Sequence, residues 1–478
     1  MTKSTGIQSL NSSVKNGPGN TNTAFDWPLA YEAESLLREC LDDFLEQNSL
    51  AKDLAGRMRD DTGTDFFEWV DHLVLSPEVE AKLLQNGFSI ASDVETTNGE
   101  TVYEHPRATL PRVRVKRNNA NPATVALRPE FVADFIARNN LPGEPEGEPY
   151  SRYRRIVVHE QAGTRLEAVE RRAYRGFTAA PISPGELVSI VKAKELWRTR
   201  QRIFNEDREG IEQAGRILKR SLELVGRDLS CQFFFEAERE YWAGRNRAAR
   251  VQKFRQDQLG LGWGNHDHHT FRCSREHFVD LIEFLLKLGF EKRERYYAGA
   301  EAGWGAQISE QSLTGIVVFA DVDLMPEETQ IDFSTRKLPP GTRLGTVGLW
   351  VGLHGESFLE AGMHHLEARF DFGLLRDQLK NCGINTMKPF SDFEFLRQAF
   401  TEGERWTVRP VRAGRLLSAG LISSSQHDQF VREGALGSHL ENLQRHGGFK
   451  GFNQKSVSAV IAATDPRKKH FEPAPTAA

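Results

Sequence analysis

Three stretches of the chain share one pattern of apolar and polar positions. Each starts with a short alternation of apolar and polar residues around a histidine, which predicts a strand with one buried face. An amphipathic segment of helical period follows, and a glycine then stands where the helix would end. The stretches are WVDHLVLSPEVEAKLLQNGF (69–88), HDHHTFRCSREHFVDLIEFLLKLGF (266–290) and GMHHLEARFDFGLLRDQLKNCGI (362–384). We therefore predict a repeated strand–helix unit.

Strand-like sequence follows the first two units. TLPRVRVK comes after the first unit, and GAQISEQ and TGIVVFADVD come after the second. Each unit is thus expected to consist of a strand, a helix and further strands. The predicted fold class is α+β.

The sequence between the first two units has a different character. LPGEPEGEP (141–149) is linker-like, because proline and glycine interrupt both helix and strand. A long charged helical region is expected from Pro184 to about Gln258, and GIEQAGRILKRSLELVG within it is amphipathic. The aromatic-rich CQFFFEAEREYW, which starts at Cys231, predicts a buried helix face.

These features divide the chain into predicted segments. Residues 1–24 and 465–478 have the composition of disordered ends. Between them we expect a first βαβββ-like module with an N-terminal helix (25–140) and a linker with a helical insertion (141–259). A second module region with the third repeat (260–464) completes the chain. A chain of 478 residues exceeds the size of one core, so two or three domains are expected.

Composition narrows the class of function. Apolar residues make up 39% and charged residues 27%, as in ordinary soluble proteins. Lys and Arg number 62 and Asp and Glu number 66, which gives no electrostatic reason to expect nucleic acid or an anionic membrane as partner. No apolar run reaches the about 18 residues of a membrane span. The first residues, MTKSTGIQSLNSSVKNGPGN, lack the apolar core of a secretory signal.

The cysteines agree with this picture. Cys40, Cys231, Cys273 and Cys382 are scattered through the chain without a CxxC pair. Such spacing disfavours both a disulfide framework and a thiolate zinc site. A cytoplasmic protein with reduced thiols is expected.

Histidine carries the strongest chemical signal. His266, His268 and His269 lie within four positions, and His364 and His365 are adjacent. Side chains alternate across a strand, so neighbouring histidines face opposite sides. The polar faces, which suit a cavity, carry His268, Thr270 and Arg272 in the second repeat and His365, Glu367 and Arg369 in the third. His269 and His364 fall on the more apolar faces, which suit packing.

These side chains suggest a metal site. Two histidines and one carboxylate from separate strands form the 2-His-1-carboxylate site of non-haem Fe(II) enzymes, which leaves positions open for a chelating substrate and O2. Neutral imidazoles and one ionised carboxylate hold Fe(II) without quenching its Lewis acidity. His72, His268 and Glu367 form one such set, with His269 and His365 as alternates because the strand registers are inferred. An ordinary core or surface role for His72 remains the alternative.

Arg272 shares the polar face of His268. A guanidinium there can hold a substrate carboxylate through two hydrogen bonds, so Arg272 is the predicted catalytic and substrate-binding residue. A structural salt bridge is the alternative role. Thr270 and Arg369, on polar faces of the same kind, are the other predicted substrate contacts.

Other motifs are weaker. HGES (354–357) has no GxSxG elbow and no triad partners in order, which disfavours a serine hydrolase. GLGWG (260–264) lacks the strand–GxGxxG–helix context of a dinucleotide site and predicts a turn. The remaining histidines are expected to be ordinary surface residues: His105, His159, His277, His427, His439, His446 and His470.

A strand that begins with histidine, followed by a helix and a GF corner, resembles the vicinal oxygen chelate superfamily. Within it, the chain is most similar to the 2-oxoadipate dioxygenase/decarboxylase (hydroxyglutarate synthase) family. VDHLVLS, NGF and TLPRVRV resemble that family's first-half pattern of a His strand, a GY/GF corner and an LPR strand. NHDHHTFRC, KLGF, AQISEQS and VVFADVD resemble its second half, and HHLEARF resembles the strand with the acidic ligand.

The resemblance covers about half of the chain and implies repeated βαβββ modules that form a half-barrel around a divalent metal. Carried over residue by residue, it implies His72 and His268 (or His269) as histidine ligands and Glu367 as the carboxylate. The family's first strand carries a Phe-Arg pair after its histidine, where this chain has LS. A Phe-Arg pair stands in the second repeat instead, at Phe271 and Arg272. This difference bears on which substrate the chain would bind.

The function that the resemblance implies is an Fe(II)-dependent dioxygenase, or one with another divalent metal, that acts on a 2-oxo acid with oxidative decarboxylation. The metal would bind the keto acid through its carboxylate and keto oxygen, with O2 in an adjacent position. An extradiol-type ring-cleaving dioxygenase, a glyoxalase-like isomerase and a non-catalytic ligand-binding protein remain alternatives. The expected partners are a small 2-oxo acid and O2, with neither nucleic acid nor membrane.

Overall fold

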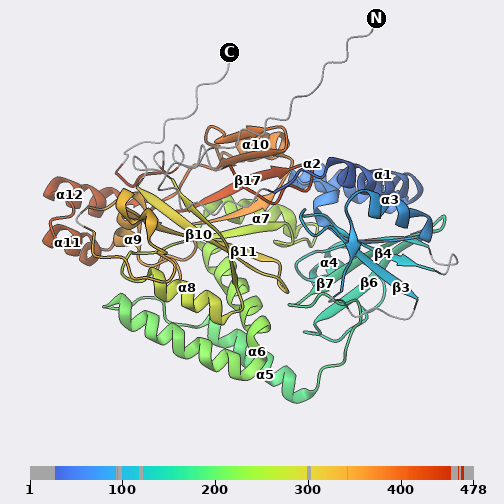
Figure 1. Ribbon diagram of the computed structural model, residues 1–478, viewed down its shortest axis with the longest axis horizontal. Helices are drawn as coiled ribbons and strands as arrows, with labels where there is room; N and C mark the ends of the chain where they lie inside the picture. Colours follow the sequence, from blue (N-terminus) through green and yellow to red (C-terminus); the bar gives the residue numbers. More distant parts are fainter. Residues whose placement is uncertain are drawn as a thin grey trace, which may run out of the picture.

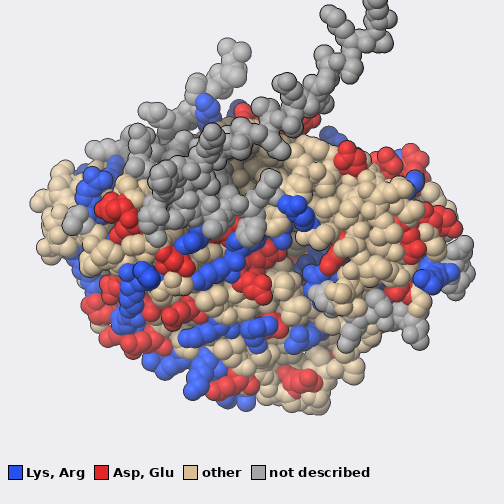
Figure 2. All heavy atoms as spheres, in the orientation of Figure 1, with Lys and Arg blue, Asp and Glu red and all other residues tan. Residues whose placement is uncertain are grey.

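Two mixed β-sheets with helices packed against them make up the described part of the chain (Figure 1). The structure is a computed structural model that describes residues 27–92, 94, 99–117, 122–298, 303–341, 343–453, 461 and 464–467. The end expected to be disordered at 1–24, and most of the one at 465–478, lie outside these residues. Basic and acidic side chains intermingle on the face shown in Figure 2, as the balanced composition predicts.

The first sheet is formed by the N-terminal part of the chain. Its strands are β1 (Val70–Leu75), β2 (Ser89–Ile90), β3 (Glu100–Glu104), β4 (Arg112–Lys116), β5 (Ala123–Leu127), β6 (Tyr153–Gln161) and β7 (Thr164–Arg171). Their order is β2-β3-β4-β1-β5-β7-β6, and β1 and β5 are antiparallel at the centre. Helix α3 (Glu80–Gln85) follows β1, and helix α4 (Val132–Asn139) follows β5. The sheet therefore consists of two strand–helix–strand modules side by side.

The second sheet repeats this plan. Its strands are β8 (His266–Arg272), β9 (Glu291–Tyr297), β10 (Trp304–Gln311), β11 (Ile316–Asp323), β12 (His365–Arg369), β13 (Ser391–Phe393), β14 (Leu396–Phe400) and β17 (His439–Arg445). Their order is β13-β14-β17-β12-β8-β11-β10-β9, with β12 and β8 antiparallel at the centre. Helix α8 (Phe278–Lys287) follows β8, and helix α10 (Phe372–Asn381) follows β12. Each half is a βαβββ module, so the predicted α+β fold with repeated modules is confirmed.

The remaining elements connect or cover these sheets. The α-helices are α1 (Tyr31–Gln47), α2 (Ser49–Thr62), α5 (Pro184–Arg198), α6 (Asp207–Arg245), α7 (Arg247–Asp257), α9 (Thr346–His354), α11 (Pro410–Ser418) and α12 (Ser424–Glu433). The 3-10 helices are η1 (Phe66–Trp69), η2 (Pro77–Val79) and η3 (Pro326–Gln330), and β15 (Arg405–Trp406) pairs with β16 (Ala435–Leu436). Helices α11 and α12 stand between β14 and β17 in sequence, so they interrupt the last module.

The glycines that follow the three repeat helices end those helices as predicted. Gly87, Gly289 and Gly383 have φ values of 83°, 88° and 72°, in the left-handed region that a β-carbon disfavours. After Gly289, the amide of Phe290 donates to the carbonyl of Leu285 at 3.1 Å. This bond closes the helix end and turns the chain back towards the sheet.

The helical insertion packs against the second sheet. Figure 1 shows α5 and α6 side by side, close to α8. Phe234 of α6 lies 5.1 Å from Trp197 of α5 and 5.1 Å from Phe284 of α8 between ring centroids. It also stacks on Phe271 of β8 at 6.3 Å. The aromatic helix face is therefore buried as predicted, on the side of β8 that faces away from the polar residues.

The chain has one module more than the three repeats that the sequence predicts. The third repeat pairs with the second, because β12 lies beside β8 in one sheet. The first repeat pairs with a module that the sequence analysis did not identify, formed by β5, α4, β6 and β7. The predicted boundary at 140/141 cuts through this module, since β6 and β7 follow the linker-like stretch and join β5. The helical insertion begins only at α5.

All four cysteines are free, as predicted. Among the residues that the structure describes, no helix combines the length and the apolar character that crossing a membrane requires.

Candidate metal centre

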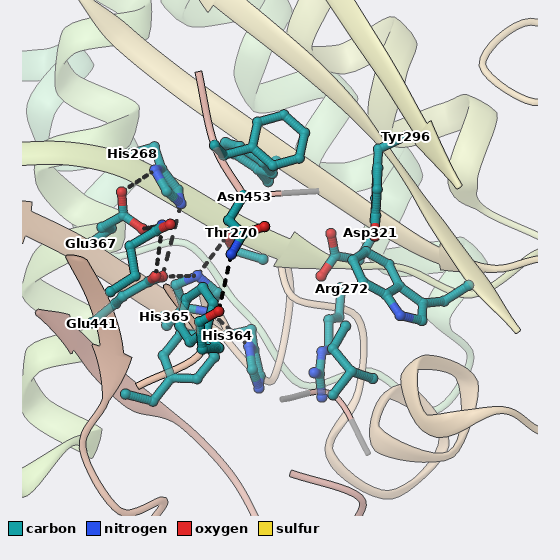
Figure 3. A pocket seen from close by; sticks show the side chains of 17 residues that line it. His268, Thr270, Arg272, Tyr296, Asp321, His364, His365, Glu367, Glu441 and Asn453 are labelled. Atoms are coloured by element: carbon teal, nitrogen blue, oxygen red, sulfur yellow. Dashed lines mark hydrogen bonds and ion pairs between the residues drawn. The ribbon is translucent and has the colours of Figure 1, made fainter. Parts of the chain in front are cut away.

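The central strands of the second sheet bring several polar side chains to one face. In the ladder between β8 and β12, His268 lies opposite Glu367 and Thr270 lies opposite His365. Strand β17 runs parallel to β12 on its other side and places Glu441 next to Glu367. All five residues line one cavity (Figure 3). Strand register alone therefore collects two histidines and two glutamates from three strands.

Three of these side chains form a candidate metal site. Nε2 of His365 lies 3.1 Å from Oε2 of Glu441, and Nε2 of His268 lies 4.0 Å from the same oxygen. One ligand atom of each residue lies within 4.8 Å of the other two. Ligand bonds to a divalent metal are about 2.0–2.2 Å long. The 3.1 Å between His365 and Glu441 suits two adjacent ligands of such an ion, whereas the longer distances between ligand atoms would have to shorten slightly. The set contains the predicted His268 and its alternate His365, but its carboxylate is Glu441.

Glu367 stands behind His268 in this arrangement. Its Oε1 lies 2.9 Å from Nδ1 of His268, the ring nitrogen on the other edge from Nε2. Gln398 of β14 donates from Nε2 to Glu367 at 3.1 Å and to Glu441 at 3.2 Å. A carboxylate on the far ring nitrogen fixes the tautomer and orientation of a ligating histidine. Glu367, which the sequence predicts to be a ligand, is thus placed to orient His268.

Asp267, His268 and Glu367 form a second group of potential ligands on the other edge of the imidazole. In this group Asp267 is already engaged by two guanidinium groups. Nη2 of Arg445 lies 3.0 Å from Asp267, and Nε of Arg369 lies 2.9 Å from it. A cation bound there would face both arginines. The carboxylate of Glu441 faces imidazoles and an amide instead, so we favour the set that contains it.

The electrostatics of the cluster fit a bound cation. Burial raises the pKa of Glu441 well above its ordinary value, and the neighbouring carboxylate of Glu367 raises it further. Burial lowers the pKa of His365 well below its ordinary value, and the charge of His268 adds to this effect. Burial also acts to lower the pKa of His268, but the Glu367 and Asp267 carboxylates outweigh it and the pKa is raised. A divalent cation would relieve the repulsion between the glutamates and favour neutral imidazoles.

The cavity beside this cluster is small and largely apolar. Its volume is about 60 Å³, which holds several water-sized groups. Phe319, Phe400 and Phe452 line it, and the Phe319 ring lies 4.3 Å from the ring of His268. Apolar walls of this kind lower the local dielectric constant and strengthen electrostatic interactions inside. The space suits a small organic acid.

Arg272 lies on the cavity face of β8, as the alternation predicts. It is 1% exposed and lines the cavity. Its Nε and Nη1 have no hydrogen-bond partner among the described residues, while the guanidinium lies 5.6 Å from the ring of Trp350. Burial lowers the pKa of Arg272 to about 10, although Asp321 and Asp323 lie nearby. The group remains a cation at neutral pH, with unsatisfied donors in the cavity.

The other two predicted substrate contacts differ from each other. Thr270 lines the cavity, and its hydroxyl lies 2.9 Å from Nε2 of His365. Arg369 is not among the residues around this cavity, and it binds Asp267 at 2.9 Å instead. A register shift in the β8–β12 ladder just after Glu367 removes Arg369 from the strict alternation that the sequence analysis assumed.

His72 lies in the first sheet, in a buried ion-pair network. Its Nδ1 is 2.7 Å from Oδ2 of Asp71, and Nη1 of Arg114 lies 3.3 Å from its Nε2. Arg171 binds Asp71 through two nitrogens, at 2.7 Å and 2.9 Å. Both ring nitrogens of His72 therefore have partners, and the residue lies apart from the candidate metal site.

The predicted set of His72, His268 and Glu367 is thus divided between two sheets. Strand register explains why the described residues of the first sheet form no equivalent group of ligands. Strands β1 and β5 pair in the same register as β8 and β12. Ala126 lies opposite His72, where the second sheet has Glu367 opposite His268. Thr124 occupies the position that corresponds to His365.

The strand on the other side of each central histidine also differs. Arg114 on β4 and Phe319 on β11 occupy equivalent positions, two residues along the parallel ladder from His72 and His268. The arginine directs a nitrogen at Nε2 of His72. The phenylalanine ring packs against His268 and leaves Nε2 of that histidine facing Glu441. One sheet therefore uses its histidine for structure, and the other presents it to the cavity.

Arg171→Met should destabilise the first sheet without changing metal binding. The change leaves Asp71 buried without its main counter-ion, and loss of one partner of a buried pair costs about 3–5 kcal/mol. Urea unfolding of metal-free protein measures this. Arg198→Met is the matched control, because Arg198 and Glu240 form an exposed pair whose loss should cost less than about 1 kcal/mol. Equal losses in both variants would contradict a structural role for the buried network.

Acidification should destabilise the fold through its buried histidines. Burial lowers the pKa of His72 to about 3, despite its bond to Asp71, and lowers the pKa of His354 to about 3 as well. Unfolded histidine takes up a proton near pH 6.5. Below that pH the unfolded state binds more protons than the folded state. Each of these histidines therefore lowers the free energy of unfolding by up to about 1.4 kcal/mol for every unit by which the pH falls.

Thermal unfolding between pH 7.5 and 5.0 tests this effect. The midpoint should fall steadily below pH 6.5, and His354→Gln should show a shallower fall than the unchanged protein. A midpoint that stays constant or rises on acidification would show that the depressed pKa values do not govern stability.

The sequence pattern does not single out Glu441, and two histidines that it places at the surface are buried. Glu441 lies in HLENLQR, where its spacing of two from His439 offered a strand signal outside the three repeats. His439 and His277, expected at the surface, are 1% and 5% exposed. The alternate ligand His269 points away from the site, and its ring packs against Phe235 at 4.9 Å.

Comparisons with known proteins give distant likenesses. No family model and no curated protein matches the sequence. The chain is similar to methylmalonyl-CoA epimerase from Mycobacterium tuberculosis at 12% identity and a TM-score of 0.22, over 38% of this chain and 88% of that chain. It is similar to a mutant of 4-hydroxymandelate synthase from Streptomyces coelicolor at 12% identity and a TM-score of 0.27, over 83% and 98%. A xylose isomerase-like TIM barrel/4-hydroxyphenylpyruvate dioxygenase fusion protein matches at 10% identity and a TM-score of 0.26, over 83% and 52%. At these values the assignment of fold and site rests on the topology and geometry described above.

Proposed function

We propose that this chain is an Fe(II)-dependent dioxygenase that acts on a small 2-oxo acid with oxidative decarboxylation. The convergence of His268, His365 and Glu441 beside a small, largely apolar cavity supports this proposal most. Two imidazoles and one carboxylate from separate strands are the donor set of non-haem Fe(II) oxygenases. Fe(II) held by these residues would supply a site for chelating the keto acid and activating O2.

The protein's own groups prepare this site. The Glu367 carboxylate lies 2.9 Å from Nδ1 of His268, and Oδ1 of Asp267 lies 3.4 Å from the same nitrogen. A proton held on Nδ1 by these carboxylates would leave the lone pair of the ring on Nε2. Gln398 donates to both glutamates and holds them in place. The phenylalanine walls keep bulk water from the reacting groups. Each of these contacts is made before any substrate binds, which favours preorganisation.

Arg272 supplies recognition at the other end of the cavity. A buried donor without a partner costs about 1–3 kcal/mol, so a ligand oxygen that accepts from Nε or Nη1 would be favoured there. A small acid with its keto end at the metal cluster would direct its remote polar group towards Arg272. The residue would thereby orient the substrate as well as bind it.

The reaction can be tested directly. Protein purified without O2 and loaded with Fe(II) should consume O2 and release CO2 in equal amounts when a small 2-oxo acid is added. The Glu441→Ala variant should do neither. O2 uptake with a catechol but with no keto acid would indicate a ring-cleaving dioxygenase instead. Isomerisation of a substrate without O2 uptake would indicate a glyoxalase-like enzyme, and either result would contradict the proposal.

A further inference from the structure

A buried carboxylate lies beside Arg272 and takes no part in the candidate metal site. Asp321 on β11 is the ladder neighbour of Arg272 on β8, and both side chains line the cavity. Figure 3 shows both at the end of the cavity away from Glu367 and Glu441. Asp321 is 4% exposed. A guanidinium and a carboxylate therefore line the end of the cavity that lies away from the candidate metal site; this end is called the remote end.

These two opposite charges are not joined to each other. In the part of the chain that the structure describes, no ion pair within 4.0 Å links Arg272 to Asp321, and no hydrogen bond reaches the Asp321 carboxylate. Asp323, two residues along the same strand, accepts bonds from three backbone amides at the start of α9, at 2.7–3.2 Å. Asp323 thus has a structural role in holding α9, whereas Asp321 directs an unused acceptor into the cavity.

The charge state of Asp321 follows from its surroundings. Burial raises the pKa of Asp321 to about 7, and the charges of Arg272 and His268 only partly offset this effect. In mildly alkaline solution the carboxylate is ionised. A ligand group between these side chains would then meet donors on the Arg272 side and an acceptor on the Asp321 side.

We infer that Asp321 is a specificity-determining residue, which together with Arg272 selects a substrate whose remote end is a neutral group with an acceptor and a donor on neighbouring atoms. A primary carboxamide is the simplest such group. Its carbonyl oxygen accepts from the guanidinium, and its NH2 group donates to the carboxylate. The inference deepens the proposed function, since it rests on that function for the position of the keto acid at the metal end.

The other simple end groups fit less well. A carboxylate would accept hydrogen bonds from Arg272, but its second oxygen would face the Asp321 carboxylate. Both of these oxygens are acceptors and both groups are negative, so they would repel each other. A methyl group would leave both buried side chains without partners. Sites built for hydrogen bonds discriminate strongly against analogues that leave such groups unpaired. The sequence alone predicts a carboxylate on Arg272, and the position of Asp321 revises that expectation.

Calorimetric titration at pH 8 tests the inference with glutaramate and glutarate, which share a carbon chain and differ only in one end group. The metal-free protein and the Fe(II)-loaded protein are both titrated, the second without O2. Glutaramate should bind about tenfold more tightly than glutarate to the unchanged protein. In Asp321→Asn the acceptor becomes an amide that can donate, so the ratio should fall to one or below. Asp377→Asn, an exposed change of the same kind on α10, should leave the ratio as it was.

The outcomes separate the two proposals. Tighter binding of glutarate to the unchanged protein, equal ratios in Asp321→Asn and the unchanged protein, or binding of neither probe would each overturn the inference. The comparison of the two probes on the unchanged protein does not depend on how a variant folds. A protein that prefers glutaramate but neither takes up O2 nor releases CO2 would contradict only the proposed reaction.

Discussion

Glu441→Ala should abolish tight binding of a divalent metal while the protein remains folded. The change removes one of three converging ligand atoms, whereas loss of an outer partner of a ligand typically lowers affinity about 10–100-fold. Loss of the ligand itself should exceed that range. Metal content after loading without O2 and dialysis measures the effect, and circular dichroism confirms that the sheets persist.

Two further variants make this prediction specific. Glu367→Ala should weaken metal binding by about 10–100-fold, because in the proposed site its carboxylate lies against Nδ1 of His268 and is not one of the three ligands. His72→Ala should leave metal content unchanged, because that histidine lies in the other sheet. Greater loss in Glu367→Ala than in Glu441→Ala would reverse the roles of the two glutamates. Loss of metal in His72→Ala would contradict the separation of His72 from the metal site.

Arg272→Lys should weaken substrate binding while metal content stays normal. Lysine keeps the charge but lacks the planar fork of donors that can contact two ligand atoms. Hydrogen bonds to a charged group contribute on the order of 1.5–3 kcal/mol, which corresponds to roughly 10- to 150-fold in kcat/KM. Steady-state kinetics with 2-oxo acids that carry a polar remote group measures the loss.

A keto acid without a polar remote group is the matched substrate for this variant, and it should lose much less. Arg198→Lys, an exposed arginine on α5, should leave kcat/KM unchanged for both substrates. If Arg272→Lys and Arg272→Ala both retain full kcat/KM for every active substrate, Arg272 has only a structural role and its unfilled donors do not meet the ligand.

Local patterns in the sequence predict the faces of the central strands. The alternation in DHHTFRC places Thr270 and Arg272 on the cavity face and Phe271 in the core, and the structure agrees. The glycines after the three helices also follow from local chemistry, because a left-handed residue ends a helix in the same way wherever it occurs. Properties of this kind depend on neighbours within a few residues.

Pairing between distant strands could not be predicted in the same way. Glu441 meets His365 only because β17 returns to β12 after the α11–α12 insertion. The choice between Glu367 and Glu441 depends on which edge of His268 each one faces, and side-chain alternation does not contain that information. The shift just after Glu367 likewise moves Arg369 away through a local irregularity in the ladder.

The module formed by β5, α4, β6 and β7 could not be predicted from the repeated pattern either. The strand that pairs with β1 carries Thr124 and Ala126 where its counterpart carries histidine and glutamate, so it lacks the residues that marked the other repeats. Its helix is followed by the proline- and glycine-rich stretch 141–149, which breaks the local pattern before β6 begins. The resemblance places His72 at the metal through its histidine strand, and the partner strand of β1 carries no histidine or glutamate opposite it or two residues along.

The most direct test of the candidate site is a crystal structure of the Fe(II)-loaded protein with anomalous diffraction recorded at the iron edge. The geometry predicts one peak in the second sheet, bound by Nε2 of His268, Nε2 of His365 and the carboxylate of Glu441, with Glu367 on Nδ1 of His268. A peak held by Asp267 and Glu367, or one at His72 in the first sheet, would contradict this assignment.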